Sequence, residues 1–118
     1  MSKEKLYIFD TTLRDGAQTQ GVDFSIDDKE KISNSLDALG VDYIEGGWPG
    51  ANPTDTEFFN KDHGFKKSKL TAFGMTKKSE HSAENDPMLA SLINSKSSSV
   101  CLFGKSWDFQ VDVALRVT

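Results

Sequence analysis

The stretch SIDDKEKISNSLDALGVDYIE, residues 25–45, decides the fold, because it has the pattern of a capped helix followed at once by a strand. Ser25 can accept a backbone N–H at the start of the helix, and acidic residues follow in the first turn, where the helix dipole is positive. Gly40 ends the helix as a C-terminal cap, and residues 41–45 form the strand. The stripe expected to be buried comprises Ile32, Leu36 and Leu39, and the residues expected to face water are Lys29, Glu30, Lys31, Ser33 and Asn34.

The same alternation extends in both directions along the chain. Upstream, residues 6–9 form a short apolar run rich in strand formers, which suits a strand buried on both faces. The other predicted strands are 69–74 and 98–103, and the other predicted helices are 54–60, 87–93 and 111–117. Strands that alternate with helices about every 30 residues predict right-handed βαβ units and a parallel sheet. We therefore expect an α/β fold with no internal domain boundary.

Two α/β architectures fit this alternation: an open doubly wound sheet, and the N-terminal half of a (β/α)8 TIM barrel with about four βα units. The open sheet predicts a glycine-rich phosphate loop after the first strand, yet residues 10–18, DTTLRDGAQ, contain neither G-x-G-x-x-G nor a Walker lysine. A whole barrel takes about 250 residues, and an apolar helical pattern still continues at residues 114–118. We expect residues 1–118 to be a partial TIM-barrel catalytic domain, truncated before the second half, whose open sheet edges favour a homodimer or other self-association.

The charge balance narrows the classes of partner. Lys and Arg number 14 against 18 Asp and Glu, so we expect no basic surface of the kind that holds nucleic acid or anionic lipid. No run approaches the roughly 20 apolar residues of a membrane helix, and no secretory leader is recognised. We expect a cytoplasmic protein without nucleic-acid or membrane partners. The single cysteine, Cys101, lies in the run VCLF and is expected to be a small buried hydrophobic residue.

Charged residues follow or end the first two predicted strands. Arg14 and Asp15 come just after the first strand, and Glu45 ends the second, so a parallel sheet would bring all three to the rim where barrel active sites lie. There an aspartate can ligate a divalent cation, an arginine can polarise a carbonyl, and a glutamate can orient the arginine or exchange protons. A structural salt-bridge cluster around Arg14 explains the same residues equally well.

Other residues with possible chemistry carry weaker signals. His63 and His81 lie in polar segments with no partner at metal-ligand spacing, which favours solvated side chains over a metal site. Trp48 and Trp107 follow strand ends and suit either packing or the wall of a substrate pocket. The remaining apolar side chains expected in the core are Phe58, Phe59, Met88 and Leu89.

Three motifs at three strand ends together resemble a known family. They are DTTLRDGAQ at residues 10–18, YIEGGWPGANP at 43–53 and FGKSWD at 103–108. The first resembles the opening signature of the metal-dependent acyl-CoA condensing and lyase barrels, which include 2-isopropylmalate, homocitrate and citramalate synthases and hydroxymethylglutaryl-CoA lyase. The other two look most like the citramalate synthase branch. The resemblance covers essentially the whole chain.

The resemblance implies a Claisen-type condensation of acetyl-CoA with a 2-keto acid, in that branch pyruvate giving citramalate for isoleucine biosynthesis. It implies that Asp15 ligates a divalent metal such as Mg, Mn, Zn or Co, and that Arg14 polarises the keto group. It also implies that Glu45 is a catalytic residue and that Gln18 contacts the substrate. These roles predict losses in turnover more than in binding, because the charge they stabilise develops in the transition state.

The chain departs from the family at the metal site. Relatives carry a His-x-His pair on a late strand, and neither His63 nor His81 has a histidine two residues away. We therefore expect the isolated chain not to catalyse the condensation. Two alternatives remain open: an enzyme similar to 2-isopropylmalate or homocitrate synthase, and a non-catalytic truncated product.

Overall fold

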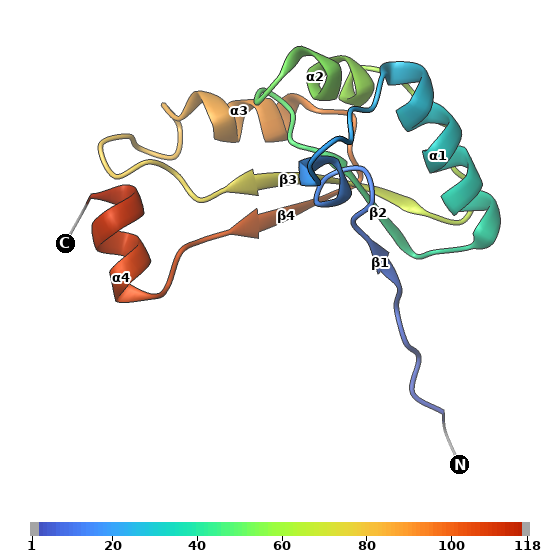
Figure 1. Cartoon of the computed structure of the whole chain (residues 1–118), viewed down its shortest axis with the longest axis horizontal. Helices are drawn as coiled ribbons and strands as arrows, with labels where there is room; N and C mark the ends of the chain where they lie inside the picture. The colour runs from blue at the N-terminus through green and yellow to red at the C-terminus, as the bar shows by residue number, and fades with distance from the viewer. Residues whose placement is uncertain (1–2, 117–118) are drawn as a thin grey trace.

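A computed structural model describes residues 3–116, and Figure 1 shows strands and helices alternating along the chain. The strands are β1 (Phe9–Asp10), β2 (Tyr43–Gly47), β3 (Lys69–Met75) and β4 (Ser99–Phe103). The helices are η1 (Gly16–Gln18), α1 (Ile26–Leu39), α2 (Pro53–Phe59), α3 (Pro87–Asn94), α4 (Asp108–Gln110) and the π-helical turn η2 (Val111–Leu115). The predicted α/β alternation is confirmed, with β2 beginning two residues later than expected.

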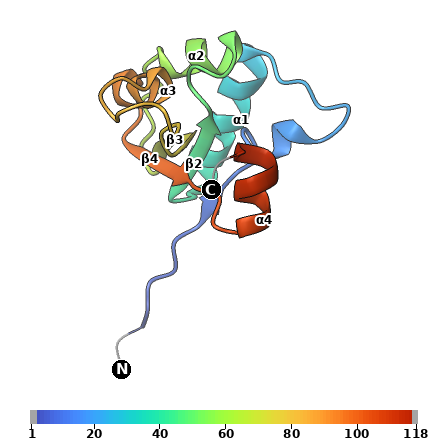
Figure 2. The ribbon, with the colours of Figure 1, turned by 90° about the vertical axis from the view of Figure 1, so that its left-hand side faces the viewer.

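The four strands form one parallel sheet in the order β1-β2-β3-β4. Each strand therefore lies beside its neighbour in sequence, as in the wall of a barrel. Among the strands of residues 3–116 the order does not reverse as it does in a doubly wound sheet. Helices α1, α2 and α3 cover one face of this sheet, whereas α4 lies apart from them (Figures 1 and 2). The fold is that of the N-terminal half of a TIM barrel.

Helix α1 has the predicted caps at both ends. The Ser25 hydroxyl accepts a hydrogen bond from Asp28 N, and the Asp28 carboxylate accepts one from Ser25 N, which completes a capping box. Gly40 closes the helix at φ 92°, a left-handed conformation that glycine adopts without steric cost. Both ends of this helix are thus encoded locally.

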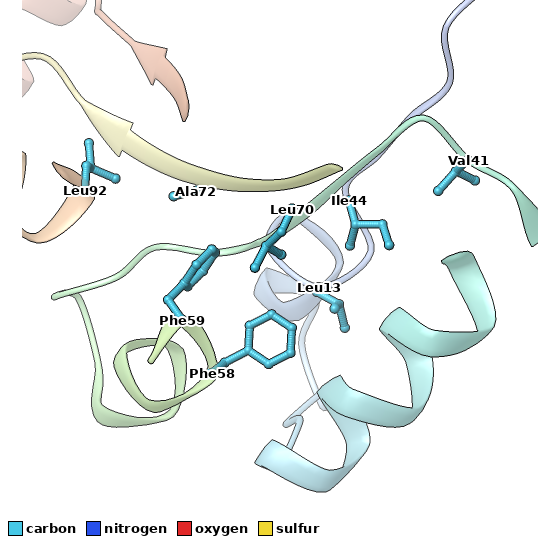
Figure 3. Close-up of a cluster of buried hydrophobic side chains, with 8 residues drawn as sticks. All are labelled: Leu13, Val41, Ile44, Phe58, Phe59, Leu70, Ala72 and Leu92. Atoms are coloured by element: carbon cyan, nitrogen blue, oxygen red, sulfur yellow. The ribbon is translucent and has the colours of Figure 1, made fainter. Parts of the chain in front are cut away.

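The hydrophobic core lies between β2, β3 and the helices that cover them (Figure 3). Its fully or largely buried members are Leu13, Val41, Ile44, Phe58, Phe59, Leu70, Ala72 and Leu92. Gly46 lets helix α2 approach the sheet closely, because a Cβ at that position would lie 2.7 Å from the Phe58 ring. Phe58 and Phe59 are core residues as predicted, while Met88 and Leu89 are partly buried.

The buried face of α1 differs from the predicted one. Lys29 and Ser33 are 2% and 0% exposed, although both were expected to face water, and Leu39 is exposed although it was assigned to the buried stripe. The helix packs through positions 26, 29, 32, 33 and 36, so Ile32 and Leu36 of the predicted stripe do contact the core. The sequence pattern does not indicate this face, because Lys29 and Ser33 are polar residues within it.

The predictions for the first strand and for the last helix are also wrong in part. Residues 6–9 are exposed rather than buried on both faces, and only Phe9 and Asp10 pair, because β1 is flanked by a single strand in the described structure. The last helical segment begins at Asp108 rather than residue 111, and residue 117 lies outside the described range. Within residues 3–116, no helix is both long and apolar enough to cross a membrane.

Candidate active site

A tight turn after β1 presents Arg14 and Asp15 at the carboxyl end of the sheet. The carbonyl oxygen of Thr11 accepts from Arg14 N (3.2 Å), Asp15 N (2.8 Å) and Gly16 N (3.1 Å), so the chain folds back around one acceptor. The Leu13 side chain, within the same turn, is fully buried in the hydrophobic core. The backbone around Arg14 is therefore fixed by hydrogen bonds on one side and packing on the other.

Arg14 and Glu45 form the centre of the site. Arg14 Nε donates a hydrogen bond to Glu45 Oε1, and Glu45 is 1% exposed. Glu45 lies in the middle of β2, which continues to Gly47, and does not end the strand as expected. The Arg14 guanidinium also lies 4.1 Å from the centroid of the Phe73 ring, on neighbouring β3. A buried carboxylate needs a charged partner, and Arg14 supplies it. One edge of the guanidinium is thus committed to Glu45, which fixes the orientation of the rest.

The other two predicted site residues lie on the solvent side of this pair. The Asp15 side chain is 63% exposed, with Oδ1 3.6 Å from Arg14 Nη1. Gln18 is exposed in η1 and lines, with Arg14, a cleft of about 450 Å³ that also includes Trp48 and Asn52. The structure therefore brings residues 14, 15 and 45 together, with an exposed carboxylate near Nη1 of Arg14 and a buried carboxylate bound to its Nε.

Cys101 adds a thiol beside the buried carboxylate, a neighbour that the sequence did not indicate. Its position on β4 is paired with Phe73 on β3, and its side chain is half-buried rather than fully buried. Burial raises the pKa of the Cys101 thiol above its ordinary value, and the charge and hydrogen bonding of Glu45 raise it further. The thiol therefore stays protonated at neutral pH, which makes it a poor nucleophile.

Lys29 and Asp55 form a second buried ion pair at the edge of the cleft that contains Arg14 and Gln18, and the sequence pattern did not indicate either residue. Lys29 Nζ lies 2.8 Å from Asp55 Oδ1, and it also donates to the carbonyl oxygens of Leu13 (2.8 Å) and Gly46 (2.7 Å). The available signal was the position of Lys29, three residues after Ile26 and on the same helical face. A lone lysine on an otherwise apolar face indicates a buried partner, because an unpaired ammonium does not remain there.

The two histidines contact residues outside the Arg14–Glu45 pair, whereas the two tryptophans differ in their surroundings. His63 Nε2 lies 2.7 Å from the carbonyl oxygen of Phe58, and its ring packs against two phenylalanine rings, so it is not the solvated side chain that was expected. His81 Nδ1 lies 3.5 Å from Asp86 Oδ2. Trp48 packs edge-on against Phe73 and also lines the cleft, whereas Trp107 is exposed.

No metal site is complete in the part of the chain that the structure describes. Among residues 3–116, no group of three or more His, Cys, Asp or Glu side chains is arranged to hold a metal ion. Asp15 is an exposed carboxylate that could contribute one oxygen ligand, while the Glu45 carboxylate is engaged by Arg14. The side chains present can therefore supply one ligand of a divalent-cation site.

Comparison of the sequence with known proteins identifies a family that the chain matches. The HMGL-like family model matches residues 5–117. The chain is 52% identical over 117 residues to an (R)-citramalate synthase of Aquifex aeolicus, which covers 98% of this chain and 22% of the relative. It is 46% identical over 120 residues to an (R)-citramalate synthase of Sulfolobus acidocaldarius, which covers 100% of this chain and 23% of the relative.

A relative with another name matches less closely. A 2-isopropylmalate synthase of Caldanaerobacter subterraneus is 34% identical over 119 residues, covering 100% of this chain and 29% of the relative. The chain therefore spans between a fifth and a third of the length of these curated relatives. With a family model that matches nearly its whole length, the chain belongs to the HMGL-like family.

Proposed function

We propose that this chain forms the keto-acid-polarising part of a condensing enzyme that joins the acetyl group of acetyl-CoA to pyruvate. The observation that carries the proposal is the arginine held at the barrel rim by a buried glutamate. Relatives named (R)-citramalate synthase are 43–52% identical to the chain, which supports pyruvate as the keto acid. In the reaction, the acetyl methyl group loses a proton and attacks the ketone carbon, and thioester hydrolysis then releases citramalate and CoA.

Arg14 is proposed to stabilise the alkoxide that forms as the ketone is attacked. Its Nε is used by Glu45, so its Nη groups are the donors that can bind the ketone and carboxylate oxygens of the keto acid. A guanidinium that is already oriented loses little entropy when it binds, and it meets charge that appears only in the transition state. Glu45 is proposed to orient Arg14, and Gln18, in the same cleft, to contact the substrate.

Asp15 is proposed as one ligand of a divalent cation. Its carboxylate is exposed beside Arg14, which places any ion that it binds next to the group that polarises the ketone. Such a cation, whether Mg, Mn, Zn or Co, supplies Lewis-acid polarisation of the keto acid when bound. One carboxylate does not fill the coordination shell of these ions, so substrate oxygens and further protein groups have to complete it.

The substrate proposal is tested by placing the chain in a whole barrel. The matching segment of the Aquifex aeolicus synthase is replaced by residues 1–118, and CoA release from acetyl-CoA is measured with pyruvate and with 2-oxoisovalerate. We expect a clear preference for pyruvate in the chimera and no activity in the isolated chain. Preference for 2-oxoisovalerate assigns the chain to 2-isopropylmalate synthesis instead. An inactive chimera that folds like the parent contradicts the proposal.

The remaining proposals concern location and assembly. We propose a cytoplasmic enzyme whose partners are acetyl-CoA and the keto acid. We also propose self-association, because apolar side chains of β4, of β1 and of the segment before β1 are exposed in the described structure. These exposed side chains are Leu6, Tyr7, Ile8, Phe9, Val100, Leu102 and Phe103.

A further inference from the structure

We propose that Lys29 and Asp55 are a positioning pair, which sets the spacing between the two backbone segments that carry Arg14 and Glu45. The inference about geometry stands on this structure alone, and its consequence for catalysis rests on the proposed function. Both residues also line the cleft that contains Arg14 and Gln18, but neither forms a side-chain hydrogen bond or ion pair with Arg14 or Glu45 in the part of the chain that the structure describes. Their effect is exerted through the backbone on either side of the Arg14–Glu45 pair.

The lysine ammonium joins the two segments directly. Lys29 Nζ donates to the carbonyl oxygen of Leu13 at 2.8 Å and to that of Gly46 at 2.7 Å. Leu13 immediately precedes Arg14, and Gly46 immediately follows Glu45. Lys29 Nζ also forms an ion pair with Asp55 Oδ1, at 2.8 Å. A single buried atom thus fixes the distance between the turn after β1 and the end of β2.

Asp55 fixes the ammonium from the side of helix α2. Its second oxygen, Oδ2, accepts from Trp48 N at 2.9 Å, and its own N–H donates to Asn52 Oδ1 at 2.8 Å. The carboxylate lies against the backbone of Gly47, where a Cβ would come within 2.6 Å of it. Gly47 also has φ +147°, which other residues rarely adopt. The glycine therefore makes room for the carboxylate at the end of β2.

A buried ion pair is an inefficient way to stabilise a fold, which argues for a different role here. Desolvation of the two charges offsets most of their attraction, so apolar residues of similar size serve stability equally well. Apolar contacts have little directional preference, whereas two short hydrogen bonds and an ion pair to fixed partners specify one arrangement. The buried ammonium therefore specifies where the Arg14 and Glu45 segments lie relative to each other.

The test observes the Arg14 Nε–H directly in the 118-residue chain, using exchange of its proton with water in ¹⁵N NMR spectra. The variants are Lys29→Met and the pair Lys29→Met/Asp55→Asn, which leaves no unpaired buried charge. Ser68→Ala is the matched control, because it removes a buried hydrogen bond to Val41 O before β2, at the other end of the sheet. We expect exchange to accelerate at least about tenfold in both Lys29 variants, as for loss of a charged hydrogen bond, and to be unchanged in the control.

Protection of the Arg14 proton in the folded pair variant, equal to that of the unsubstituted chain, overturns the proposal. Loss of folding in both Lys29 variants overturns it as well, because the pair would then support the whole fold rather than one spacing. The same variants in the chimera are expected to lower kcat about 100-fold through misplacement of the catalytic group, with the KM for acetyl-CoA unchanged. If the unsubstituted chimera is inactive, the proposed function fails, and the NMR result still decides the positioning role.

Discussion

The central strands β2 and β3 and the outer strands β1 and β4 all contain apolar residues, but these residues are buried to very different extents. Ile44 on β2 and Ala72 on β3 are fully buried, whereas Val100 and Leu102 on β4 are 46% and 55% exposed. The central strands have a strand on each side and helices α1, α2 and α3 above them, while in residues 3–116 each outer strand pairs with one strand only. Burial is therefore determined by neighbours rather than by the apolar run itself.

The largest expected effect is on the free energy of unfolding, from a residue of α2 that packs against the central strands. Phe58→Ala should cost about 3–5 kcal/mol in the free energy of unfolding, because its fully buried ring leaves a cavity. Phe9→Ala on β1 should cost below about 1 kcal/mol, because that ring is already partly exposed. Urea unfolding of both variants measures the difference. Equal losses would contradict the distinction between central and outer strands.

The next effect concerns the ion pair between Arg14 and Glu45 of β2. Arg14→Lys in the chimera should lower kcat about 100-fold, as for loss of one preorganised donor. A lysine cannot bind Glu45 through one edge and present further planar donors to a substrate. Lys31→Arg, on the exposed side of α1, is the control with the same two residue types and should leave kcat unchanged. Near-normal turnover of the Arg14 variant would remove Arg14 from the mechanism.

A smaller effect is expected on self-association through the outer strand. Leu102→Glu should weaken association of the isolated chain at least about tenfold in Kd, since burying a leucine contributes roughly 1.5–3 kcal/mol. Leu39→Glu is the matched control, because Leu39 is also an exposed leucine but lies on α1. Sedimentation of the two variants over a range of concentrations separates them. Similar association in both would show that β4 is not the contact.

The sequence predicts local features of this molecule well and distant ones poorly. The caps at Ser25 and Gly40 are encoded within a few residues, and the meeting of Arg14 with Glu45 follows once the strands are parallel. The burial of Lys29 was missed because it depends on Asp55 and on carbonyl oxygens far along the chain. The exposure of residues 6–9 was missed because a strand pattern does not reveal whether neighbours exist on both sides.

The smallest effect is a dependence of stability on pH that comes from the contact between α1 and the segment before the central strand β3. The Asp37 carboxylate, on α1, accepts hydrogen bonds from the backbone N–H groups of Lys66 (3.0 Å), Lys67 (2.8 Å) and Ser68 (2.8 Å), which lead into β3. These bonds hold the pKa of Asp37 below its ordinary value.

A carboxylate whose pKa is lower in the folded state than in the unfolded chain stabilises the fold above the unfolded pKa, about 3.9 for Asp. This stabilisation is lost as the pH falls from that value through the lower pKa of the folded state. Asp37→Asn keeps an oxygen acceptor but cannot titrate, so its urea midpoint should fall less steeply below about pH 4 than that of the unsubstituted chain. Because Asp37 ties α1 to the turn before β3, identical slopes for the two proteins would mean that this tie is absent in solution.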